Sequence, residues 1–111
     1  MSTLLHICPE SDWQGAQARG EYRADSLATE GFIHCSTPAQ VIGTAGLFFR
    51  GRTGLVLLVI DPERVAAEIK YEDAGGVFFP HVYGPLELDA VTKVVPFPPD
   101  ADGTFSLPVV V

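Results

Sequence analysis

Three histidines interrupt apolar stretches of this sequence, and they are the side chains best suited to chemistry. They occur in "LLHIC", "FIHCS" and "FPHVY" as His6, His34 and His81. An imidazole can exchange a proton near neutral pH, contact a phosphate or ligate a metal. It can also be a buried residue whose ring nitrogens bond to the backbone or to a carboxylate. Since none of the three lies in a polar loop, we expect them to converge on one cleft.

The strand period decides which side chains can work with each histidine. The segments around His34 and His81 are predicted to be strands, in which successive side chains point to opposite faces. His34 then shares a face with Phe32 and Ser36, and His81 shares a face with Tyr83. We therefore expect these residues to line the cleft while their neighbours face the core.

The two cysteines are not expected to act as nucleophiles. Cys35 follows His34 directly, so on a regular strand their side chains diverge and cannot form a nucleophile–base pair. Cys8 and Cys35 are expected to be small buried residues, since two cysteines make neither a zinc motif nor a disulfide framework. With no secretory signal and no run of transmembrane length in the sequence, we expect a cytoplasmic protein with reduced thiols.

Composition restricts the partners. The chain has 111 residues and a net charge of −7, from 7 Lys+Arg and 14 Asp+Glu. We therefore expect one domain that binds neither extended nucleic acid nor a membrane, because both call for clustered cations. A small phosphorylated ligand remains possible. Arg23 and Ser26, in "EYRADSL" just before the His34 strand, are candidate phosphate contacts.

The elements that must position these residues are mostly strands. Two early helices are predicted, each begun by a capping box, Ser11 with Gln14 and Thr37 with Gln40. The second would turn its apolar residues 41, 42, 45, 48 and 49 to the core. The uniformly apolar segment 55–60 predicts a central strand covered on both faces. This pattern favours an α+β class. Strands are predicted over residues 3–8, 32–36, 55–60, 68–72, 78–83 and 91–95.

Three further expectations concern the second half of the chain. Pro80 predicts that segment 78–83 is an edge strand or an ordered loop. Glu68, Glu72 and Asp73 are expected on a solvated edge. Residues 96–111 are expected to be a Pro-rich, linker-like stretch and an apolar tail that docks on the domain or on a partner.

Several blocks together resemble a known family. "GEYRADSL", "EGFIHCSTPAQ", "LVLLVIDP" and "FPHVYGPL" occur in that order. Over residues 5–95 they are similar to a bacterial family of unknown function, family nine-fifty-two. That family resembles the ADP-ribosyltransferase-like fold, in which two small antiparallel sheets form a split barrel. The cleft between the sheets holds the nicotinamide–ribose end of NAD, so the resemblance implies NAD as a cofactor or substrate.

The resemblance also implies roles for individual residues. His6 matches a first-strand residue that contacts the ribose, and the segment from Gly31 to Ser36 matches the second element of the cleft. A late strand in that fold commonly supplies a catalytic glutamate, whereas the late block here offers His81 and Tyr83. A histidine cannot give the same stabilisation to a developing positive charge, although it can act as an acid, a base or a phosphate contact.

The leading hypothesis is a cleft that binds NAD, ADP-ribose or a phosphorylated nucleotide, with transfer or hydrolysis at the ribose as the implied reaction. No metal is expected in it. One alternative is a binding module without catalysis, which the lack of a late glutamate favours. Others are a metal-dependent hydrolase using the three histidines and an interaction protein that dimerises through residues 107–111. The candidate catalytic residues are His6, His34 and His81, and the candidate ligand-binding residues are Arg23, Ser26, Ser36 and Tyr83.

Overall fold

The predicted central strand lies at the middle of the largest apolar region. In the computed structural model, which describes residues 3–109, β4 (Leu55–Ile60) lies between β1 (Leu4–Pro9) and β8 (Val91–Pro96) in one antiparallel sheet. All six β4 side chains are buried, as its uniform hydrophobicity predicted. Alternate residues of β4 enter two separate apolar clusters, so both faces of this sheet are covered.

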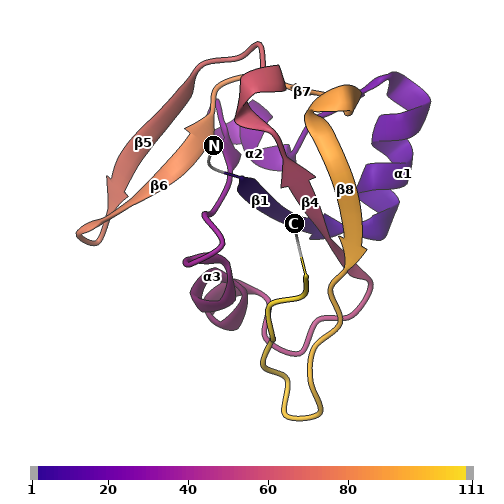
Figure 1. Ribbon diagram of the computed structural model, residues 1–111, viewed down its shortest axis with the longest axis vertical. Coiled ribbons are helices and arrows are strands. Elements are labelled where there is room, and N and C mark those ends of the chain that lie inside the picture. The colour runs from indigo at the N-terminus through magenta and orange to yellow at the C-terminus, as the bar shows by residue number, and fades with distance from the viewer. Residues whose placement is uncertain (1–2, 110–111) are drawn as a thin grey trace.

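A second three-stranded sheet carries the segments of His34 and His81, while His6 lies on β1 of the first sheet. Its order is β3 (Ile33–His34), β6 (Val77–Val82) and β5 (Ile69–Ala74), all antiparallel. A third, two-stranded sheet pairs β2 (Glu21–Tyr22) with β7 (Leu86–Glu87). An isolated bridge between Leu5 and Ser36 joins β1 to the chain that leaves β3. Figure 1 shows the β5–β6 hairpin projecting beside the central sheet, with α3 near it and α1 on the opposite side.

The α+β class is confirmed, but the arrangement of sheets differs from the expected pair. Over residues 3–109 the strands form three small sheets and no closed barrel. The helices are α1 (Glu10–Arg19), α2 (Asp25–Thr29) and α3 (Val41–Phe48), with 3-10 turns at Pro62–Arg64 and Leu88–Ala90. Helix α2 was not among the two predicted helices. None of these helices has the length and hydrophobicity needed to cross a membrane.

The first predicted capping box is not formed, and the second is formed only in part. Helix α1 begins at Glu10 directly after Pro9, and no side chain caps it, so the prediction for Ser11 was wrong. At the second box, Oε1 of Gln40 accepts from the backbone N–H of Thr37 at 3.0 Å, as predicted. The helix itself, however, begins only at Val41, the residue after Gln40. Gln40 also donates from Nε2 to the carbonyl of Phe78 at 2.8 Å, which links the start of α3 to β6.

Segment 77–82 is a central strand, and not the predicted edge strand or loop. Pro80 is buried and pairs with Tyr71 of β5, while its carbonyl accepts from the N–H of Cys35 on the other side. A strand residue directs its N–H and its C=O to the same side. The donor that proline lacks therefore falls on the side of two-residue β3, and the longer ladder with β5 is intact.

The segment after β8 packs onto the domain through two phenylalanines. Phe97 and Phe105 are buried and stack on each other, with ring centroids 4.8 Å apart. They belong to the apolar cluster that also contains Val41 and Ala45 of α3. The stretch predicted to resemble a linker is therefore anchored to the core by Phe97, while its other residues are exposed or half-buried. Of the predicted apolar tail, residues 107 and 109 are exposed, and residues 110–111 lie outside the described residues.

Candidate functional site

The register of the second sheet places two histidines side by side. His34 of β3 pairs with His81 of β6, and their ring centroids are 5.2 Å apart. Phe32 stacks on His81 with centroids 4.0 Å apart and an angle of 18° between the rings, and it also contacts Tyr83 at 5.2 Å. The predicted sharing of a face is thus confirmed for Phe32 with His34 and for His81 with Tyr83, because Ile33 and Val82, which lie between these two pairs, are buried on the opposite side.

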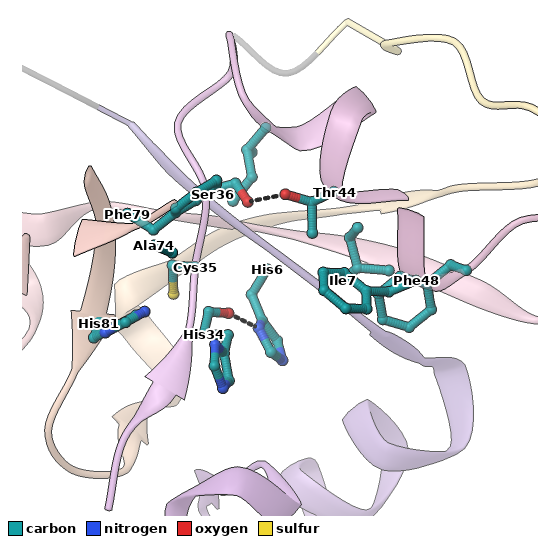
Figure 2. A pocket seen from close by; sticks show the side chains of 12 residues that line it. His6, Ile7, His34, Cys35, Ser36, Thr44, Phe48, Ala74, Phe79 and His81 are labelled. Atoms are coloured by element: carbon teal, nitrogen blue, oxygen red, sulfur yellow. Dashed lines mark hydrogen bonds between the residues drawn. The ribbon is translucent and has the colours of Figure 1, made fainter. Parts of the chain in front are cut away.

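A cavity of about 470 Å³ adjoins this face. Its apolar wall comes from β1, α3 and the β5–β6 hairpin and includes Ile7, Phe48 and Phe79. Its polar groups are the three imidazoles together with the hydroxyls of Ser36 and Thr44, as Figure 2 shows. His34 follows His6 by 28 residues, and His81 follows His34 by 47. All three nevertheless line one cavity.

Helix α3 contributes to this wall in a way that the sequence did not predict. Phe48 was expected in the core at a helical spacing with Val41 and Ala45. Those two are fully buried, whereas Phe48 remains 69% exposed at the cavity. It sits in the last turn of α3, beyond the cover of the sheet.

His6 has both ring nitrogens occupied. Nδ1 lies 2.5 Å from the carbonyl oxygen of His34, and Nε2 lies 2.7 Å from the hydroxyl of Tyr22. Because a carbonyl can only accept, Nδ1 carries the proton and Nε2 accepts from the Tyr22 hydroxyl. Burial lowers the pKa of His6 from 6.5 to about 4, so the ring is neutral at pH 7. It joins β1, β2 and β3 at the floor of the cavity.

His34 stands at the exposed end of the same group. Its Nε2 lies 3.0 Å from Oε2 of Glu30, and both side chains are about half exposed. An ion pair in such a position contributes little to stability. Its ring contacts the edges of Phe32 and His81, so His34 is free to meet a ligand at the mouth of the cavity.

His81 is held by a carboxylate on the neighbouring strand. Its Nδ1 lies 2.8 Å from Oε1 of Glu72, and the hydroxyl of Tyr83 donates to the same oxygen. These two hydrogen bonds lower the pKa of Glu72 below its ordinary value, and the bond from Tyr83 has the larger effect. The hydrogen bond to Glu72 in turn raises the pKa of Tyr83. At neutral pH the group is an ionised carboxylate between two donors.

The remaining predicted ligand residues lie in different places. Ser36 lines the cavity, with its hydroxyl 3.3 Å from that of Thr44. Ser26 donates to the carbonyl of Phe32 at 2.7 Å and fixes the turn before β3. Arg23 forms an exposed ion pair with Glu21 and does not line the cavity. The structure therefore brings Ser36 to the cavity but not Arg23 or Ser26. The predicted ligand residue Tyr83 is not part of the described lining either, because its hydroxyl is directed to Glu72.

Both cysteines are free and buried, as predicted. Cys35 lines the cavity, but burial raises the pKa of its thiol to about 12, and the same holds for Cys8. A thiol with such a pKa is a poor nucleophile near neutral pH. Over residues 3–109 no group of three His, Cys, Asp or Glu side chains has an arrangement that could hold a metal ion.

Glu72 is the site residue that sequence reasoning missed, since it was expected on a solvated edge. A signal for it was present. Gly75 and Gly76 form a two-residue hairpin turn, both with positive φ. Such a turn fixes the pairing of Glu72 with Phe79 and of Lys70 with His81. Glu72 must then lie on the face of His81, at the diagonal position.

Comparisons with known proteins agree with this architecture. A family model described as "Protein of unknown function (DUF952)" matches residues 7–94. The crystal structure of protein CC0527 from Caulobacter crescentus is 35% identical, with a TM-score of 0.88 over 96% of this chain and 95% of that chain. The solution NMR structure of CC0527 is also 35% identical and gives a TM-score of 0.81 over 94% and 91% of the two chains. No curated protein matches.

Proposed function

This chain belongs to the DUF952 family of proteins of unknown function, and we propose that its histidine-lined cavity binds one end of NAD or of a related phosphorylated nucleotide such as ADP-ribose. The proposal includes an ADP-ribosyltransferase-like relationship for the fold. The observation that carries it is that His6, His34 and His81, from three distant segments, line a single cavity.

The size and the walls of the cavity support a ligand with a flat ring. A volume of about 470 Å³ is in the range of small-molecule sites, which are mostly apolar with a few polar groups that fix orientation. The aromatic rings of Phe48 and Phe79 line it, and the hydroxyls of Ser36 and Thr44 supply hydrogen bonds. A nicotinamide ring with its ribose has these complementary features.

In our proposal the phosphates of such a ligand lie outside the cavity. Among residues 3–109 the cavity lining contains neither lysine nor arginine, so a phosphate inside would lack a cationic partner. Arg52 lies beside the lining residue Phe49, with its guanidinium carbon 5.4 Å from the centroid of that ring. We assign to Arg52 and the half-exposed His34 the phosphate contact that sequence analysis gave to Arg23.

The metal-dependent alternative is disfavoured by His6. A site made of three histidines needs one free nitrogen on each imidazole. Both nitrogens of His6 are hydrogen-bonded, to the His34 carbonyl and the Tyr22 hydroxyl. In our proposal His6 therefore positions β3 and the cavity wall, while His34 and His81 meet the ligand.

Thermal-shift and calorimetric titrations with NAD, NADP, ADP-ribose and a 2′-phosphorylated nucleotide test this function. We expect at least one of them to raise the melting temperature in proportion to the logarithm of its concentration. His34→Ala and Arg52→Ala should each weaken binding about tenfold or more. Arg64→Ala is the matched control, because Arg64 pairs with Asp61 away from the cavity. Equal affinities for all variants, or no binding of any of these nucleotides, would contradict the proposal.

A further inference from the structure

The hydrogen bonds of His81 leave one ring nitrogen for chemistry. Since the Glu72 carboxylate can only accept, the proton of the neutral ring is on Nδ1, and Nε2 carries a lone pair. Within residues 3–109 Nε2 of His81 has no hydrogen-bond partner. Every fully buried side-chain nitrogen or oxygen in these residues does have a partner, so Nε2 is not among the buried atoms. Nε2 is therefore accessible, on a residue that lines the cavity.

The His81 ring is also fixed in orientation. Phe32 stacks on one face of it at 4.0 Å, and His34 meets it at 75° with centroids 5.2 Å apart. Its side chain is only 10% exposed. A base of this kind needs no reorganisation before it accepts a proton, which is the property that an efficient general base requires.

The other two histidines do not combine these features. His6 has no free nitrogen. His34 is half exposed, and Glu30 binds its Nε2 at the surface, where water competes for both groups. The three imidazoles therefore have different roles. His6 holds the strands together, His34 meets the ligand at the mouth, and His81 can exchange a proton.

Resting on the nucleotide function proposed above, we propose that His81 is the general base of an NAD glycohydrolase reaction, with Glu72 as its positioning residue. Nε2 of His81 takes a proton from water while the water oxygen forms a bond to C1′ of the nicotinamide ribose. The C1′–N bond breaks, and its electron pair leaves with nicotinamide, which departs neutral. The proton on His81 then passes to solvent, so the products are ADP-ribose, nicotinamide and one proton.

Glu72 provides the negative charge that the late block of the sequence lacks. It lies on β5, not on β6, and reaches the site because the two strands are paired. During the reaction its carboxylate stabilises the imidazolium that forms on His81. The lack of a late glutamate was the reason to favour a binding module, and in this proposal the Glu72–His81 pair contributes by proton transfer instead.

Nicotinamide release from NAD tests the inference, with ADP-ribose binding measured on the same proteins by calorimetry. His81→Gln should lower kcat by about 100-fold or more, the typical contribution of a general base. Glu72→Gln should lower it about tenfold or more and remove the Nδ1–H signal of His81 from NMR spectra. Glu68→Gln, the same change at an exposed carboxylate just before β5, should leave kcat and the Nδ1–H signal of His81 unchanged.

The pH profile separates a base from a structural residue. The wild-type rate should fall on the acid side, where imidazolium cannot accept a proton, and the residual rate of His81→Gln should lack this limb. The titratable groups that face His81 are Glu72 and Lys70 from β5, His34 from β3 and Tyr83 after β6.

The outcomes distinguish the two proposals. If ADP-ribose binds but the wild type releases no nicotinamide, the glycohydrolase inference is wrong and the nucleotide function stands. If nicotinamide release is the same in Glu72→Gln and His81→Gln as in the wild type, the assigned roles are wrong. If neither ADP-ribose nor NAD binds, the nucleotide function itself fails.

Discussion

Nδ1 of His81 lies 2.8 Å from Oε1 of Glu72, and that oxygen also accepts the hydroxyl proton of Tyr83. The three residues come from two strands of one hairpin and its continuation. A carboxylate with two donors on one oxygen is stabilised in its ionised form, which is why the pKa of Glu72 is lowered.

Removal of the Tyr83 hydroxyl should therefore raise the pKa of Glu72. In Tyr83→Phe the largest cause of the lowered pKa is gone, and only the bond from His81 and weaker charge effects remain. Carboxyl-detected NMR titration of Glu72 measures the change. Tyr71→Phe is the control, since Tyr71 lies on the opposite face of β5. An unchanged titration midpoint in Tyr83→Phe would show that this hydrogen bond is not formed in solution.

Stability should fall as the solution is acidified below neutral pH, because of His6. Its pKa is 6.5 when unfolded and about 4 when folded, so between these values the unfolded chain binds a proton that the folded chain does not. The free energy of unfolding therefore decreases as pH falls through this window, by roughly 3 kcal/mol in all and about 2 kcal/mol between pH 7 and pH 5. Urea denaturation at several pH values measures it.

Two histidine variants isolate this effect from that of the carboxylates. His6→Gln should flatten the dependence of stability between pH 7 and pH 5, whatever its effect at pH 7. His34→Gln should retain the dependence, because His34 is about half exposed. The same slope in wild type and His6→Gln would mean that His6 is not buried as a neutral ring.

The segment after β8 should contribute strongly to stability. Phe97 is 1% exposed and stacks on Phe105, so Phe97→Ala leaves a large gap in the apolar cluster beneath α3. We expect a loss of about 3–5 kcal/mol, typical for truncation of a buried phenylalanine. Denaturant unfolding compares Phe97→Ala with Phe78→Ala. The side chain of Phe78 is 59% exposed, so its removal should lower the free energy of unfolding by less than about 0.5 kcal/mol. Equal losses would show that residues 97–105 do not pack as described.

Local patterns predicted the parts of the fold that depend on burial alone. The apolar segment 55–60 was predicted to be a central strand, and the strand period placed Phe32 on the same face as His34. The strand period did not predict that Cys35 also lines the cavity, where the strand ends after His34. Features that depend on pairing between distant segments were not predicted. Pro80 is central because its partner β3 is short, which no property of the segment around Pro80 indicates.

The candidate site divides in the same way. The sequence identified the three histidines, but it could not show that Tyr22 and the His34 carbonyl occupy both nitrogens of His6. Those contacts depend on where β1, β2 and β3 meet in space. The role of Glu72 follows from the register of a hairpin whose turn is readable as Gly75–Gly76, so this part could have been predicted.

Titration of ADP-ribose into protein with ¹⁵N-labelled histidine measures binding at each imidazole separately. We expect saturable shifts of the ring nitrogens of His34 and of Nε2 of His81, with little change at Nε2 of His6, which stays bonded to Tyr22. If the ring ¹⁵N shifts of His34 and His81 do not change in a large excess of ADP-ribose, the nucleotide does not bind in this cavity.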